Sequence, residues 1–168
     1  MTNQTPPPVA IDDVVFLGRA VERLSVLIAD QSQAVFDWMG IVIPVRSCSL
    51  MTVLATHGPA TASDLARALG HSHQLVMQKI PKLLRLGLIE HRADRDDARR
   101  RVFHLTDDGV DQVARFDRST ALLRAAYDGL FAEVGDVRHC VDRTMDALTA
   151  TPLDTRIRSL GVPERADG

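Results

Sequence analysis

The sequence has few aromatic residues and two cysteines, and it lacks long apolar runs. Phenylalanine, tyrosine and tryptophan make up 4 % of the 168 residues, which leaves no evident platform for a stacked cofactor. Cys48 and Cys140 lie far apart, as expected of free thiols in a reducing compartment and not of a disulfide framework. No stretch approaches the roughly 18 apolar residues of a membrane-spanning helix, and the N-terminus has no signal-peptide pattern. We therefore expect a cytoplasmic protein.

Enzyme motifs are also missing from the sequence. It contains no glycine-rich phosphate loop, no nucleophile elbow and no cluster of residues with metal-ligand spacing. His71 and His73, or His139 and Cys140, would hold a metal only if folding brought them together. We expect neither an enzyme nor a bound cofactor or metal.

Charge is unevenly distributed along the chain. The net charge is −2, yet the segment 67–106 carries nine basic and four acidic residues, a net +5 that leaves −7 for the remainder. A local cationic face supplies affinity for the phosphates of duplex DNA, while an acidic remainder limits non-specific binding. This polarity indicates one surface that faces DNA.

Hydrophobic periodicity divides the chain into five parts. Prolines mark residues 1–10 as a flexible arm. Residues 11–48 read as helices with a break near Gly40, and residues 107–151 read as further helices with a break near Gly135. The central part is 49–106, and 152–168 is a polar tail. We interpret the flanking helices as dimerisation helices because their apolar stripes need a partner.

The central part has the pattern of a winged helix-turn-helix. One short helix begins near Thr61 and ends at Gly70, and a second begins after Ser72 and ends before Gly87. Residues 88–92 and 101–106 then read as two strands, and the charged loop 93–100 joins them as a basic wing. The expected fold class is mainly α with a small β-wing, flanked by N- and C-terminal dimerisation helices.

Four stretches of this segment carry a family pattern: residues 57–66, residues 83–90, Asp97-Ala98-Arg99, and the step from Leu105-Thr106 to Gly109. On these residues the segment resembles the MarR family of transcription regulators. It covers 57–109, about a third of the chain. The resemblance implies a homodimeric bacterial or archaeal repressor or activator, often released from DNA by a small aromatic ligand or by oxidation.

The second helix of a helix-turn-helix enters the major groove, where glutamine pairs with adenine. Arginines of a wing insert into the minor groove, and Asp97 would orient those arginines. The expected DNA-binding residues are Ser72, His73, Gln74, Met77, Gln78, Lys82, Arg95, Arg99 and Arg100. The two glutamines also fit a simpler interpretation, in which they are solvated polar residues of an amphipathic helix.

Three residues of the recognition helix depart from the family pattern. Gln78 stands where an arginine is common, and Lys79 stands where an apolar residue is usual. Pro81 removes the amide that would bond to Met77 and predicts a kink. These departures put individual base and phosphate contacts in doubt, while the fold assignment is unaffected.

The resemblance also implies an effector pocket between the dimerisation helices and the winged unit. The candidate pocket residues are Phe36, Trp38, Met39, Arg46 and His57, each of which also fits an ordinary core or surface role. Cys48 and Cys140 are candidate oxidant sensors, although helical cysteines without neighbouring cations are usually small core residues.

The leading hypothesis is an effector-responsive repressor that binds a pseudo-palindromic operator as a homodimer. The expected partners are double-stranded DNA, a second copy of the chain and a small aromatic effector. The alternative is a winged-helix module that binds a protein or small molecule and has lost operator recognition, which Pro81 and Gln78 would permit.

Overall fold

The computed structural model describes residues 10–93 and 100–161. These fall into two compact units, divided between Ser119 and Thr120 within one long helix. The helices are α1 (Leu17–Trp38), α2 (Cys48–His57), α3 (Ala62–Leu69), α4 (His73–Arg85), α5 (Asp107–Val134), α6 (Val137–Ala150) and α7 (Leu153–Arg158). Short 3-10 turns, η1 (Val14–Phe16) and η2 (Val45–Ser47), precede α1 and α2.

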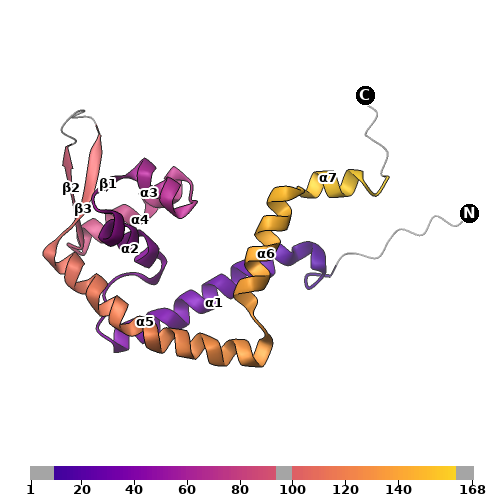
Figure 1. Ribbon diagram of the computed structural model, residues 1–168, viewed down its shortest axis with the longest axis horizontal. Coiled ribbons are helices and arrows are strands. Elements are labelled where there is room, and N and C mark those ends of the chain that lie inside the picture. Colours follow the sequence, from indigo (N-terminus) through magenta and orange to yellow (C-terminus); the bar gives the residue numbers. More distant parts are fainter. Residues whose placement is uncertain (1–9, 94–99, 162–168) are drawn as a thin grey trace, which may run out of the picture. The chain divides into compact units, whose positions relative to one another are not determined.

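The described residues also form one antiparallel sheet of three strands, β1 (Ala60–Thr61), β2 (Ile89–Ala93) and β3 (Arg101–Leu105). Strand β3 lies in the middle, paired with β1 through Ala60 and Phe103 and with β2 through His91 and the same Phe103. Figure 1 shows β2 and β3 side by side next to α3 and α4. The predicted winged helix-turn-helix is confirmed, and β1 was not predicted because two residues are too short to show a period.

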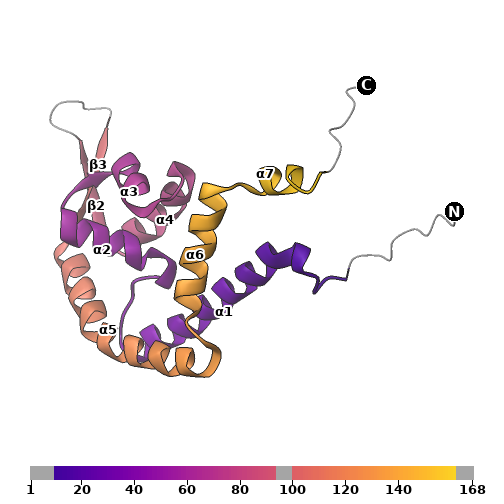
Figure 2. The ribbon, with the colours of Figure 1, turned by 45° about the vertical axis from the view of Figure 1, so that its right-hand side comes forward.

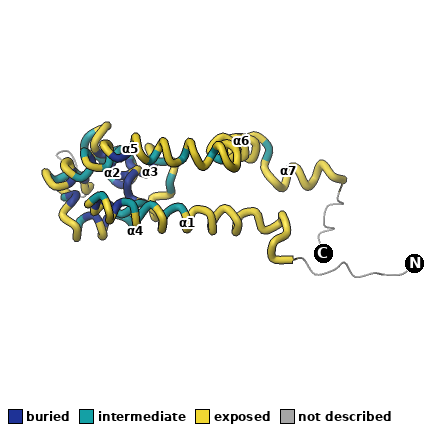
Figure 3. The backbone as a smooth tube through the Cα atoms, turned by 90° about the horizontal axis from the view of Figure 1, so that it is seen from below, coloured by how far each residue is buried: buried dark blue, intermediate teal, exposed yellow. Residues whose placement is uncertain are grey.

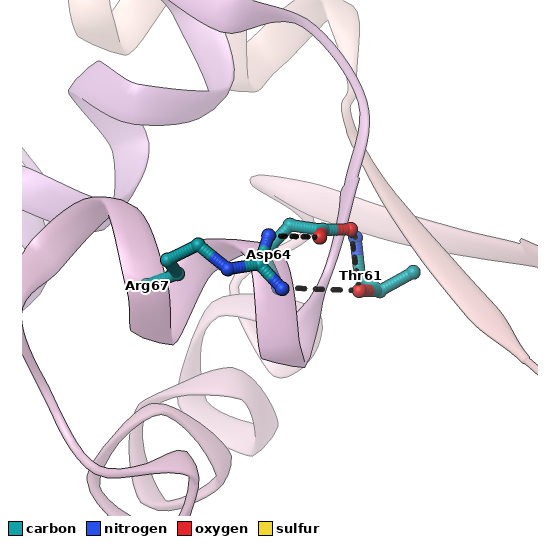
Figure 4. Close-up of polar contacts among 3 residues, drawn as sticks. All are labelled: Thr61, Asp64 and Arg67. Carbon is teal, nitrogen blue, oxygen red and sulfur yellow. Dashed lines mark hydrogen bonds and ion pairs between the residues drawn. The ribbon is translucent and has the colours of Figure 1, made fainter.

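Local sequence signals explain where α3 begins and ends. Thr61 is the N-cap: its hydroxyl accepts from the Asp64 amide at 3.2 Å, and the Asp64 carboxylate accepts from the Thr61 amide at 3.3 Å. Arg67 donates to the other carboxylate oxygen of Asp64 at 3.0 Å (Figure 4). Gly70 ends the helix at φ +61°, a left-handed conformation that glycine adopts without steric cost. The turn before α4 is therefore fixed on both sides.

Pro81 lies inside α4 without ending it, since the helix continues to Arg85. Proline has no amide hydrogen, so the carbonyl of Met77 receives no bond from residue 81. Met77 and Pro81 are both exposed, so water can hydrate the Met77 carbonyl and offset the lost hydrogen bond.

The core of the first unit lies among α2, α3, α4 and the sheet, and the buried positions in Figure 3 gather there. Leu50, Leu65, Val76 and Leu83 are each fully enclosed. Phe36 of α1 adds to this core by packing edge-on against Phe116 of α5, with ring centroids 5.7 Å apart. The second helix of the helix-turn-helix is thus held by its apolar face.

Apolar side chains of α1, α6 and α7 lie on the surface of the chain. On α1 they include Leu17, Val21 and Leu24, which are 53 %, 48 % and 41 % exposed. The predicted apolar stripe of the N-terminal helix is therefore present on α1, where these three side chains are open to solvent. None of the helices in the described part of the chain is both long and apolar enough to cross a membrane.

The segment expected to be a polar tail contains a helix. Helix α7 begins directly after Pro152, and its Leu153 and Ile157 are exposed, as is Leu160 after the helix end. Arg156 folds back to donate to the carbonyls of Ala147 and Thr151, at 2.7 and 2.8 Å. These bonds add a side-chain donor to two carbonyls at the C-terminal end of α6, which the composition of the tail did not indicate.

Candidate nucleic-acid interface

Helix α4 has one buried face and one polar face. Val76, Ile80 and Leu83 are buried against the core, and residues on the opposite side of a helix of 3.6 residues per turn face solvent. The predicted DNA-reading residues Gln74 and Gln78 lie on that open face and are exposed. The polar face is continued by His73, Met77 and Lys82, which are exposed as well.

Ser72 has a structural role at this surface. It is the N-cap of α4, and its hydroxyl accepts from the Leu75 amide at 3.2 Å. This bond uses an acceptor that was predicted to meet DNA, although the hydroxyl hydrogen is left to donate.

A groove of about 320 Å³ lies along one side of α4, between α3 and the wing strand β3. Two arginines line it, Arg100 and Arg101, opposite His73 and Met77 of α4 and Ser63 of α3. Arg100 was predicted to bind DNA, whereas Arg101 was interpreted only as the start of a strand. The period-2 pattern assigned Arg101 to the strand but could not show that it lines a groove together with residues of α4.

A second groove of about 300 Å³ lies along the other side of α4, between that helix, η2 and α1. Its basic residues are Arg46, Lys79 and Lys82, and α1 contributes Asp30 and Gln33. Lys79 had been noted only as a departure from the family pattern, since sequence spacing does not show which residues of η2 approach α4.

The electrostatics of this second groove favour an anion. Partial burial lowers the pKa of Lys79, and the nearby positive charge of Arg46 lowers it further. Burial and the charge of Lys79 likewise lower the pKa of His71, whose Nδ1 is buried and unpaired. In the part of the chain that the structure describes, neither Arg46 nor Lys79 has a carboxylate within ion-pair distance.

Most of the wing tip lies outside the described residues. Arg95, Arg99 and Asp97, predicted to insert into the minor groove or to orient the inserted arginines, all fall in 94–99. The base of the wing is described, and there Arg92 of β2 donates to Glu90 at 2.6 Å. Figure 2 shows β2 and β3 rising together from the winged unit.

The residues named for an effector pocket differ in their environments. Phe36 belongs to the core, Trp38 is 81 % exposed, and His57 is exposed beside the Thr56 hydroxyl, 2.9 Å from its Nδ1. Met39 is half-buried after the end of α1. Arg46 lines a groove, but that groove is formed with the recognition helix. The family resemblance, and not a packing pattern in the sequence, had grouped these residues, so their pocket role stays a prediction.

The two cysteines differ in environment. Cys48 is buried at the start of α2, with its sulfur 3.8 Å from the Pro44 carbonyl oxygen, and burial raises the pKa of its thiol to about 12. A thiol with that pKa is almost wholly protonated at neutral pH and so a poor nucleophile. Cys140 is exposed on α6. Among the described residues, no three histidine, cysteine or acidic side chains gather into a metal-binding group.

Comparison with known proteins agrees with this architecture. The model of the MarR family matches residues 43–100. No protein of curated function matches the chain. A solved MarR family transcription regulator is 24 % identical, with 80 % of this chain and 88 % of that one aligned at a TM-score of 0.54.

Two further solved structures are similar. The transcriptional repressor CouR, bound to a 23-mer DNA duplex, is 19 % identical over 85 % of this chain and 97 % of its own, with a TM-score of 0.59. The transcriptional regulator BldR from Sulfolobus solfataricus is 15 % identical over 85 % and 99 %, with a TM-score of 0.57. The resemblance to the MarR family is therefore confirmed, and the chain has the winged-helix fold of that family's transcription regulators.

Proposed function

We propose that this chain, which shares its winged helix with the MarR family, is a DNA-binding transcription regulator and not an enzyme. The observation that carries the proposal is the exposed polar face of α4, with Gln74 and Gln78 at its centre and basic residues on both flanks. A helix of roughly 10–12 Å diameter fits the major groove, which is about 12 Å wide. The DNA-bound state of CouR, a protein of the same fold, supports this assignment.

The regulator acts as a homodimer. The exposed apolar residues of α1, such as Val21 and Leu24, and those of α6, such as Met145 and Leu148, are the surfaces that a second copy would cover. Two copies related by a two-fold axis place two recognition helices on successive major grooves, about one helical turn apart. The operator is then a pseudo-palindrome, and the protein works in the cytoplasm, where bacterial and archaeal DNA lies.

Selection of bound fragments from a random DNA pool, followed by a mobility-shift titration at several salt concentrations, tests DNA binding. We expect an enriched two-fold motif and an affinity that falls steeply as salt rises, because released counterions drive the association. A folded dimer that retards no fragment would overturn the proposal.

A variant distinguishes DNA-dependent regulation from the alternative function, a winged-helix module that binds a protein or small molecule. Replacing Arg100 and Arg101 with glutamine removes two charges from the groove beside α4, and we expect loss of regulation in the cell together with loss of DNA binding in vitro. Regulation that persists after DNA binding is lost would favour the module.

The proposal also includes repression that is relieved by a small aromatic effector, as the family resemblance implies. A ligand that binds the folded protein and not the unfolded chain raises the midpoint temperature of unfolding, and the rise grows with ligand concentration. Screening small aromatic acids for such a rise, and then for release of the selected DNA, tests this part. A panel without effect on either readout would remove the effector from the proposal.

A further inference from the structure

The two grooves described above lie on opposite sides of the recognition helix. Met77 lines the groove beside the wing, and Lys79 lines the groove beside η2. Two residues correspond to roughly 200° of turn around a helix axis, so these side chains leave α4 in nearly opposite directions. Gln78, between them in sequence, is exposed on the polar face and also lines the η2 groove.

The η2 groove has positive charge that its own residues leave unneutralised. Arg46 and Lys82 are exposed, and Lys79 is half-buried in the same groove. The side-chain amide of Gln33 already makes two hydrogen bonds: it accepts from the Val45 amide at 3.3 Å and donates to Asp37 at 2.9 Å. Asp30 also lines the groove but makes no ion pair within the described residues. An anion entering from outside would relieve the repulsion between Arg46 and Lys79.

We propose that the groove formed by Arg46, Lys79 and Lys82 is a second phosphate-binding site, which holds the sugar-phosphate backbone of the DNA strand on the η2 side of α4. This inference rests on the proposed function and adds a contact that the wing does not supply. A helix seated in the major groove has a sugar-phosphate strand on either side of it, and phosphate contacts from both flanks fix its register. Arg100 and Arg101 serve one strand, and Arg46 and Lys79 serve the other.

The salt dependence of DNA affinity tests the proposal. Each phosphate neutralised contributes roughly 0.9 to the slope of log affinity against log salt, so loss of one contact in both protomers lowers the slope by about 1.8. We expect this decrease for Lys79→Gln and for Arg46→Gln, on every DNA sequence alike. Lys79→Arg, which keeps the charge, should restore the wild-type slope.

Arg118→Gln is the matched control, since Arg118 is exposed on α5 outside this groove. The thermal midpoint of each variant verifies that it is folded. Slopes for Lys79→Gln and Arg46→Gln that equal the control slope, measured on folded variants, would overturn the proposal. Failure of the proposed function would look different, because then the wild-type protein itself would bind no DNA.

Free phosphate is the other source of the same ligand chemistry. Inorganic phosphate at millimolar concentration is added to wild type and to Lys79→Gln without DNA. If it raises the midpoint of wild type alone while the salt slopes stay equal, the groove takes a free anion and the DNA contact is refuted. A lowered slope with no effect of free phosphate is the result that we expect.

Discussion

Gly109 of α5 lies directly against the carbonyl of Leu88, the residue before β2. A β-carbon added to Gly109 would be 2.0 Å from the Leu88 oxygen, far inside van der Waals contact. The amide of Thr106 also donates to that carbonyl at 3.2 Å, and the Thr106 hydroxyl accepts from the Gly109 amide at 3.0 Å. This contact ties the start of α5 to the wing and gives a physical reason for the Leu-Thr-x-x-Gly step seen in the sequence.

Gly109→Ala should therefore destabilise the protein by about 3 kcal/mol or more, because the backbone has to move to admit a methyl group. Gly129→Ala is the matched control in the same helix: no atom lies within 4 Å of its added β-carbon, and we expect about 0.5–1 kcal/mol of stabilisation. Urea unfolding at one fixed protein concentration measures both. Equal effects of the two substitutions would contradict the close approach.

Thr61→Ala should cost about 1 kcal/mol, since it removes the side-chain cap of α3. The hydrogen bonds from Thr61 lower the pKa of Asp64, with a smaller contribution from Arg67. A carboxyl whose pKa is lower in the folded state stabilises the fold above its unfolded pKa, near 3.9, and this contribution is lost as pH falls through the folded value.

Urea unfolding of wild type and Thr61→Ala at pH 7 and at pH 3 measures this linkage. We expect the stability difference between them to be smaller at pH 3 than at pH 7, because the contribution of the carboxylate's hydrogen bonds with Thr61 is lost progressively as acid protonates Asp64. A difference that grows on acidification would show that the capping box does not stabilise the carboxylate. Ser63→Ala, on an exposed residue next to the cap, is the control.

Cys48 should resist alkylation at pH 7.5 in the native state. Its pKa is raised to about 12 by burial, so the reactive thiolate is scarce, and the enclosed sulfur is also hard to reach. The Cys140→Ser variant leaves Cys48 as its one thiol, and mass spectrometry should find it modified at least 100-fold faster in denaturant than in the native state. Native modification at the rate of a free thiol would instead make Cys48 a credible oxidant sensor.

Leu24→Asp should weaken self-association while leaving the winged unit folded, because Leu24 is exposed on α1 and not part of the core. Burial of a leucine contributes roughly 1.5–3 kcal/mol, and a two-fold interface loses it twice. The dimer dissociation constant should rise at least about 100-fold by sedimentation equilibrium. Arg23→Gln, a polar change next to it on α1, is the control, and an unchanged constant for Leu24→Asp would exclude this stripe from the interface.

Gln74→Ala and Gln78→Ala should relax base preference more than they weaken overall binding. A bidentate glutamine contact with adenine is worth about 1–3 kcal/mol of discrimination. Repeating the selection from random DNA with each variant locates the position that loses its preference. If both variants select the wild-type motif, the glutamines are merely solvated residues of an amphipathic helix.

The sequence was sufficient where structure depends on neighbouring residues. Thr61, Gly70 and Ser72 act within a few positions of themselves, so the ends of α3 and the start of α4 were predictable. The alternation of apolar residues likewise predicted β2 and β3, which fold within a residue or two of the expected ranges.

The sequence was insufficient where residues distant along the chain come together. Arg46 and Lys79 share a groove across 33 positions, and nothing in the spacing of either residue indicates this. Trp38 and Phe36 are two positions apart, yet one is 81 % exposed and the other is 2 % exposed. Which side chain faces a neighbouring helix depends on packing that one sequence does not display.

The order of the sheet has a consequence for solubility. Strand β2 is an edge strand, paired with β3 on one side, so its other side presents backbone groups that could recruit a strand from another molecule. Glu90 and Arg92 place an ion pair on this strand, and charged side chains on an edge discourage such additions. These charges therefore disfavour the addition of a foreign strand at this edge of the wing.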